Sequence, residues 1–108
     1  MFFLRKDFPE SAVWKRPAYF RDGEAVYEET PIRLRLIKIM EYEQENARPA
    51  IVRIFLVEPR HEISCQDIIH YRGTDYSVRQ LEKKFDFSGD AVCTRCMCGS
   101  VMRRWGYR

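Results

Sequence analysis

The sequence is poor in the residues and motifs from which most enzyme sites are built. It has only two histidines and contains no glycine-rich phosphate loop, no His-Glu-x-x-His and no Gly-x-Ser-x-Gly. The carboxylates are scattered, and nothing in the sequence holds two of them together for acid–base catalysis. His61 lies in a charged turn, and His70 lies on the polar face of a predicted hairpin, opposite Asp75. We therefore predict a protein that is not an enzyme and has no catalytic residue.

Long apolar runs are also missing. No segment approaches the ~18 consecutive apolar residues of a membrane span, so no membrane partner is expected. The apolar residues at positions 1–4 precede the first basic ones, which makes a poor signal peptide, and the four cysteines do not resemble an extracellular disulfide framework. We expect a protein made in the cytoplasm. Its 108 residues, 45% hydrophobic and 32% charged, suffice for one globular domain with a core of its own.

The clearest local structure is a β-hairpin over residues 67–81. Arg72 and Gly73 form its two-residue loop, in which Gly73 supplies the positive φ that a tight turn requires. This register places His70 opposite Asp75. Alternation then puts the apolar side chains on one buried face of a core sheet. The core hairpin residues are Ile69, Tyr71, Gly73, Tyr76 and Val78.

The other segments resemble strands separated by turns. An N-terminal arm (1–10) precedes a strand with Pro17 at an edge position, and Asp22-Gly23 predicts a hairpin turn. The apolar pattern of residues 32–40 switches phase, as at a β-bulge. We predict an all-β, single-domain small barrel or sandwich of six or seven short antiparallel strands. The expected segments are strands at 11–19, 25–29, 32–40, 51–57 and 91–102, a turn at 85–90, and a short run at 81–85 that could be helical.

Two polar segments interrupt this pattern. Residues 41–50 are acidic and predict a projecting inter-strand loop, either a solvated connector or a functional loop, whose charged residues are Glu41, Glu43, Glu45 and Arg48. Residues 91–108 hold four arginines and no acid, a charge of +4, whereas the preceding chain sums to −1. The basic tail at 103–108 is either solubilising or a contact for an acidic surface or a phosphate backbone. Its candidate assembly residues are Arg103, Arg104, Trp105, Tyr107 and Arg108.

The cysteines suggest a metal site but do not complete one. Cys93 and Cys96 have the Cys-x-x-Cys spacing of half a zinc site, with Cys98 and the distant Cys65 as further ligand candidates. A second pair is missing, and residues 93–98 lie in a predicted strand on which Cys96 and Cys98 share a face. We therefore expect small core residues and neither metal nor cofactor.

Taken together, these features resemble a known family. A Val-Trp-Lys-Arg strand, the Asp-Gly turn and the Ile-Arg-Leu-Arg-Leu strand precede a segment of the form Asp-x-Ile-x-Tyr-x-Gly-x-x-Tyr-x-Val. Over residues 11–98 the chain is similar to the small head–tail connector proteins of tailed bacteriophages, also called minor capsid, head completion or stopper proteins. The cysteine-rich last strand and the basic tail depart from this family. The residues that match the segment are Asp67, Ile69, Tyr71, Gly73, Tyr76 and Val78.

The resemblance implies a structural protein of the virion neck, at the head–tail interface. Such β-barrels form a homo-oligomeric ring, of twelve copies more often than six, that docks below the portal and adaptor, retains packaged double-stranded DNA in its channel and joins the tail proteins. A long loop, here residues 41–50, would point into the channel. Two alternatives remain. One is a small zinc-binding module. The other is an OB-like or SH3-like barrel that binds nucleic acid by stacking bases on Tyr71, Tyr76 and other aromatic residues and contacting phosphates with the basic tail.

Overall fold

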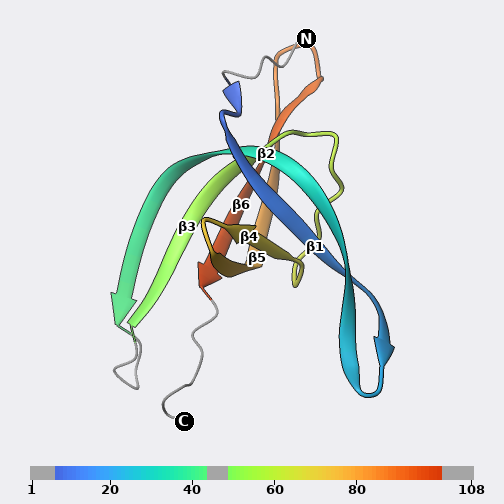
Figure 1. Ribbon diagram of the computed structural model, residues 1–108. Coiled ribbons are helices and arrows are strands. Elements are labelled where there is room, and N and C mark those ends of the chain that lie inside the picture. Colours follow the sequence, from blue (N-terminus) through green and yellow to red (C-terminus); the bar gives the residue numbers. More distant parts are fainter. Residues whose placement is uncertain (1–6, 44–48, 101–108) are drawn as a thin grey trace.

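The computed structural model describes residues 7–43 and 49–100, and side chains within 7–39 and 51–100. These residues form a single antiparallel sheet closed into a barrel, in the strand order β1-β2-β3-β6-β5-β4 (Figure 1). The prediction of an all-β barrel or sandwich is confirmed. Of these two architectures, the protein has the barrel, because its sheet is closed. The strands are β1 (Glu10–Arg21), β2 (Glu24–Glu43), β3 (Pro49–Val57), β4 (Ile68–Tyr71), β5 (Thr74–Phe85) and β6 (Ala91–Ser100).

The two tight turns lie where the sequence predicts them. In the core hairpin Tyr71 pairs with Thr74, and both loop residues have positive φ, 50° at Arg72 and 82° at Gly73. Asp22 and Gly23 repeat this conformation, with φ of 54° and 84°. Two consecutive positive φ angles define the turn whose twist matches that of antiparallel strands, so each turn fixes the register of its hairpin.

Two expectations about strand boundaries are wrong. Residues 25–29 and 32–40 belong to one 20-residue strand, β2, because Pro31 continues the ladder with β1 through its pairing with Val13. Residues 81–85 are not helical but complete β5, paired with β6. The phase switch is confirmed as a bulge, since the register between β2 and β3 shifts between Leu36 and Lys38.

The projecting loop is shorter than predicted. Tyr42 pairs with Ala50 and Glu43 pairs with Pro49, so residues 41–43 and 49–50 are strand. Backbone pairing requires no apolar side chain, and an antiparallel ladder therefore continues through this acidic stretch. Glu41 and Glu43 lie on β2, whereas Glu45 and Arg48 fall outside the described residues.

The barrel interior is packed around aromatic and branched side chains. Phe55 is fully buried and meets Tyr71 and Tyr76 edge to face, with ring centroids 5.0 and 5.8 Å apart. Aromatic pairs prefer this geometry because the positive edge of one ring faces the negative face of the other. The predicted buried face of the core hairpin is thus confirmed. The buried cluster also includes Ala12, Trp14, Ile32, Leu34, Val57, Ile63, Ile69, Val78, Cys96 and Cys98.

A buried carboxylate joins β1 to β5 beyond the start of the short strand β4, at a junction that we call the seam. Asp67, only 3% exposed, accepts hydrogen bonds at Oδ2 from Trp14 Nε1 (2.8 Å) and from the Ser64 amide (2.9 Å). Its carbonyl accepts the amide of Val78 at 2.9 Å. Because β4 spans only four residues, β1 and β5 have no strand between them beyond its start. Asp67 joins both strands at that point.

Three hairpins extend past their neighbouring strands (Figure 1). The pairing of β1 with β4 covers only Val13–Lys15, so residues 16–21 pair with β2 alone. Similarly, β2 runs past the start of β1 and β5 runs past the start of β4. The β1–β2 hairpin and the β2–β3 hairpin point to opposite sides of the barrel, at the lower right and lower left of Figure 1. These extensions carry the candidate functional surfaces.

Candidate assembly surfaces

In the part of the chain whose side chains are described, the large exposed hydrophobic residues all lie on these three extensions. Phe20 is 75% exposed, Ile39 is 51% exposed and Phe87 is fully exposed. Seven large hydrophobic residues are exposed in the described part of the chain. Each lies where a strand has run past one of its barrel neighbours, or in the turn joining β5 and β6. Single exposed hydrophobic residues are ordinary on protein surfaces, but their gathering on projecting elements marks contact sites. The set is Tyr19, Phe20, Tyr27, Ile37, Ile39, Phe85 and Phe87.

The first surface is the aromatic arm, defined as residues 16–29 of the β1–β2 hairpin. Tyr19, Phe20 and Tyr27 are exposed on it. The Arg21 guanidinium lies 5.7 Å from the Tyr19 ring centroid and donates a hydrogen bond to its hydroxyl at 3.2 Å. At its base Arg16 pairs with Glu28 and lies 5.2 Å from the ring centroid of Trp14. These contacts organise the arm along its own length, and the three aromatic rings stay open to solvent.

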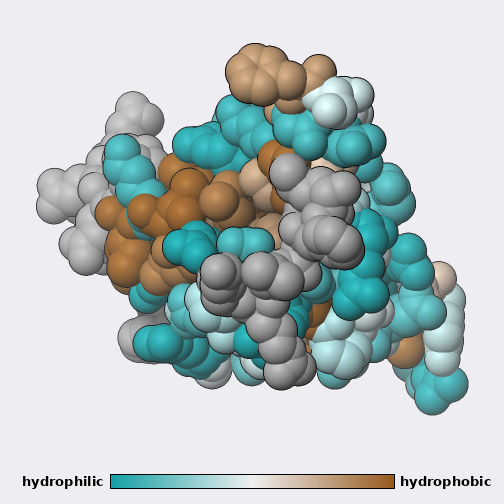
Figure 2. Space-filling model, turned by 90° about the horizontal axis from the view of Figure 1, so that it is seen from above, coloured by the Kyte–Doolittle hydropathy of each residue, from teal (hydrophilic) through white to brown (hydrophobic). Residues whose placement is uncertain are grey.

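The second surface is the isoleucine ridge, defined as residues 35–39 of β2. The bulge after Leu36 leaves Ile37 and Ile39 about half exposed. Figure 2 shows a hydrophobic patch on the side of the molecule where the β2–β3 hairpin lies in Figure 1. Arg35 and Lys38 give the ridge two positive charges and no negative one. The third surface, the phenylalanine tip, comprises Phe85 and Phe87 at the β5–β6 turn.

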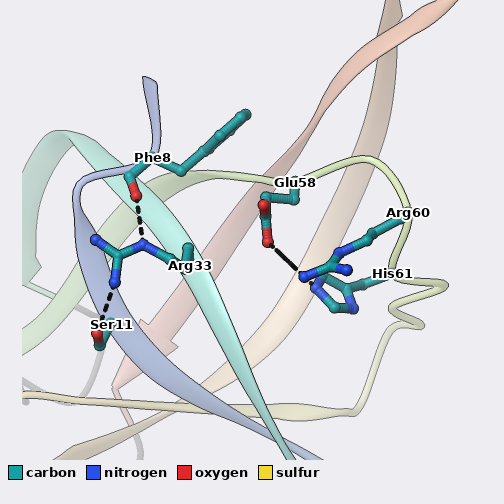
Figure 3. Close-up of polar contacts among 6 residues, drawn as sticks. All are labelled: Phe8, Ser11, Arg33, Glu58, Arg60 and His61. Atoms are coloured by element: carbon teal, nitrogen blue, oxygen red, sulfur yellow. Dashed lines mark hydrogen bonds and ion pairs between the residues drawn. The ribbon is translucent and has the colours of Figure 1, made fainter. Parts of the chain in front are cut away.

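Basic residues of β2 anchor the segment that leads into the barrel. Arg33 donates from Nε to the carbonyl of Phe8 at 2.9 Å and from Nη1 to Ser11 Oγ at 3.2 Å (Figure 3). Arg35 donates to the carbonyl of Asp7 at 2.9 Å. Phe8 itself is buried. Positions 1–6 of that arm lie outside the described residues.

The polar cross-strand pair of the core hairpin forms as predicted. His70 Nδ1 lies 2.7 Å from Asp75 Oδ1, and Lys15 Nζ lies 3.6 Å from the same oxygen. Burial alone would raise the pKa of Asp75, but the hydrogen bond from His70 and the charge of Lys15 lower it below its usual value. Both side chains of the pair are 40% exposed on the outer face of the sheet. The contact therefore stabilises the negative charge of Asp75 at the protein surface.

The tyrosines expected as stacking platforms are not available for bases. Tyr71 and Tyr76 are 2% and 4% exposed because both point into the barrel, and the Tyr71 hydroxyl donates to Glu10. Desolvation raises the pKa of Tyr71, and its hydrogen bond to Glu10 acts in the same direction. The choice of Tyr71 and Tyr76 as stacking platforms is therefore wrong. Ranges 7–43 and 49–100 also hold 13 basic and 15 acidic residues, a net charge of −2, whereas a backbone-tracking groove needs a basic stripe.

The cysteines do not converge. Cys96 and Cys98 are fully buried in the core, and Cys65 is exposed. Burial raises the pKa of Cys96 to about 12, and the thiolate that binds metal is therefore disfavoured there. Within the described ranges, no three His, Cys, Asp or Glu side chains are grouped so that they could hold a metal ion. The geometry supports the interpretation of Cys96 and Cys98 as core residues.

The remaining candidates fall outside the described residues. These are Glu45 and Arg48 of the channel loop, and the whole assembly tail with Arg103, Arg104 and Trp105. Sequence reasoning missed the aromatic arm, although Tyr19 and Phe20 lie three and two residues before Asp22 of the Asp-Gly turn and could have marked an exposed tip. It also missed the seam role of Asp67, which has no local signal because its partner Trp14 lies 53 residues away.

No family model matches the chain, and no curated protein sequence is significantly similar to it. Of the residues that the structure describes, none belongs to a helix long and apolar enough to cross a membrane.

Proposed function

We propose that this protein is a structural component of the neck of a tailed bacteriophage, a head–tail connector of the head completion or stopper type. It forms a ring below the portal, of twelve copies rather than six, retains packaged double-stranded DNA and joins the tail. The observation that carries this proposal is that, among residues 7–39 and 51–100, the large exposed hydrophobic side chains lie on hairpins that extend past their neighbouring strands. Such hairpins suit repeated contacts between subunits and with other rings.

A ring demands two different contact surfaces on each copy. In a heterologous interface, one patch of a subunit meets a different patch of its neighbour, and closure of the rotation gives a ring. The aromatic arm and the isoleucine ridge lie on opposite sides of the barrel (Figure 1), as such a contact requires. The phenylalanine tip then remains for the portal side or the tail side of the ring.

Electron microscopy of the cognate portal with and without this protein tests the proposal. We expect collars of density below the portal when the protein is added, and co-sedimentation of the two. A portal that neither gains density nor retains the protein in sedimentation would contradict the neck function. Portal-free protein serves as the control for self-association.

A second experiment addresses the channel. Glu41, Glu43 and Glu45 recur in every copy, and a ring with these residues facing inward would present a negative lining that repels DNA and lets it slide. Neutralising all three to Gln should leave portal binding intact and change the fraction of particles that retain DNA. Particles with unchanged DNA retention would show that this hairpin does not face the channel.

A further inference from the structure

The aromatic arm is a two-stranded ribbon with exposed aromatic side chains. Between residues 16–21 and 24–29 its two strands pair only with each other. An isolated two-stranded hairpin is marginally stable in water, and stability comes from packing one face against another element. Tyr19, Phe20 and Tyr27 remain exposed, so no other described part of the barrel supplies that packing. A partner must provide the apolar surface.

The net charge of the aromatic arm indicates which surface is its partner. The arm carries Asp22, Glu24, Glu28 and Glu29 against Arg16 and Arg21, a net charge of −2. Two arms packed together would bring like charges into one interface, which disfavours that pairing. The isoleucine ridge has the complementary character, since its two exposed isoleucines are flanked by Arg35 and Lys38.

Position and backbone chemistry limit how the contact forms. The arm and the ridge lie on opposite sides of one molecule (Figure 1), and the hydrophobic patch of Figure 2 is on the ridge side. Pro17 and the register shift after it interrupt the outer edge of β1, and proline at an edge discourages strand addition. The contact therefore uses side chains, with aromatic rings against isoleucines.

We propose that the aromatic arm of one copy docks on the isoleucine ridge of the next copy, with Phe20 as its apolar anchor. This inference rests on the proposed ring and names the contact that propagates it. Each copy offers one arm and one ridge. A chain of copies therefore grows head to tail until it closes.

Two variants, each with one surface disabled, provide the test. Phe20→Ser disables the arm, and Ile39→Ser disables the ridge. Loss of a central interface anchor costs about 2 kcal/mol or more, which corresponds to roughly 30-fold weaker association at 1.4 kcal/mol per tenfold. In sedimentation velocity at high protein concentration, we expect wild-type chain to self-associate and each variant alone to be monomeric.

Mixing the two variants is the decisive measurement. The intact arm of Ile39→Ser can still meet the intact ridge of Phe20→Ser, whereas the other two surfaces are disabled. The mixture should form heterodimers and nothing larger. An arm-to-arm contact predicts instead that Ile39→Ser associates like the wild type, and no heterodimer in the mixture would overturn the docking.

The controls separate this inference from the neck function. Phe87→Ser makes the same chemical change on the phenylalanine tip and should leave self-association unchanged; a loss equal to that of Phe20→Ser would overturn the assignment. Circular dichroism checks that all variants fold. Wild-type protein that binds the portal but is monomeric when free, or whose collars form equally well with both variants, would refute the arm–ridge contact and leave the neck function standing.

Discussion

At the scale of single residues, the seam depends on one buried carboxylate. Asp67 accepts hydrogen bonds from the Trp14 indole and the Ser64 amide inside the fold. Removing it leaves both donors without a partner, and a buried unsatisfied group costs ~1–3 kcal/mol. We expect Asp67→Ala to lower the free energy of unfolding by about 3 kcal/mol, measured by urea denaturation with circular dichroism.

Asp90→Ala is the matched control for this prediction. Asp90 is exposed, and its contacts in the β5–β6 turn are made by its backbone. Surface changes of this type usually stay within about 0.5 kcal/mol. Equal stability of the two variants would show that Asp67 does not hold the seam together.

A second residue-scale prediction concerns pH. Burial lowers the pKa of His61 below its usual value of 6.5, the charge of Arg60 lowers it further, and Glu58 opposes both. As pH falls below 6.5, the unfolded chain binds a proton that the folded protein resists. The contribution of His61 is therefore complete above that value and is lost as pH falls toward the lower pKa of the folded state.

We expect the free energy of unfolding to decrease between pH 7.5 and pH 5, and His61→Gln to remove part of that decrease. The measurement is urea denaturation of both proteins across this range. The carboxylates and His70 are common to both proteins, so the difference between the two curves reports His61. Parallel curves would contradict the prediction.

At the scale of elements, we expect the barrel to fold without the aromatic arm. The core pairs of β1 lie at Ala12 and Trp14, whereas the outer part of the arm is exposed. Replacing residues 17–27 by Asn-Gly joins Arg16 to Glu28, which already face each other, through a favourable two-residue turn. We expect a folded barrel with a thermal midpoint close to that of the wild type, but without self-association.

Circular dichroism and sedimentation velocity check this expectation. Phe55→Ala is the contrasting variant, because it empties a fully buried site and such changes cost ~3–5 kcal/mol. An arm-shortened chain that unfolds would show that the arm belongs to the folding unit, and one that still associates would move the contact elsewhere.

Local patterns in the sequence predict the elements that have local causes. The Arg-Gly and Asp-Gly turns, the alternation of the core hairpin and the bulge after Leu36 all follow from neighbouring residues. The continuity of β2 through Pro31 and the length of the β2–β3 hairpin do not, because a ladder continues wherever a partner strand lies alongside. The burial of Tyr71 and Tyr76 follows from their alternation, which already favoured core residues over stacking platforms.

At the scale of the whole molecule, charge is divided between the barrel and its ends. The described ranges carry a net charge of −2, whereas the complete sequence carries +3, so the remaining segments, 1–6, 44–48 and 101–108, hold +5. A ring built from such copies would combine a mildly acidic body with basic ends. Electrostatic complementarity of this kind guides docking and makes it sensitive to salt.

The last prediction concerns the basic tail. The described strands of the barrel all lie before residue 101, so we expect deletion of residues 103–108 to leave the circular dichroism spectrum and the thermal midpoint nearly unchanged. Arginine and aromatic residues are the usual anchors of protein interfaces, and the deletion should weaken co-sedimentation with the portal. It should also reduce the salt dependence of binding, since three arginines are lost. Replacing Arg103, Arg104 and Arg108 by Gln keeps the tail length and separates charge from aromatic contact. A tail deletion that unfolds the barrel, or one that binds the portal as well as the parent at every salt concentration, would exclude the tail from assembly.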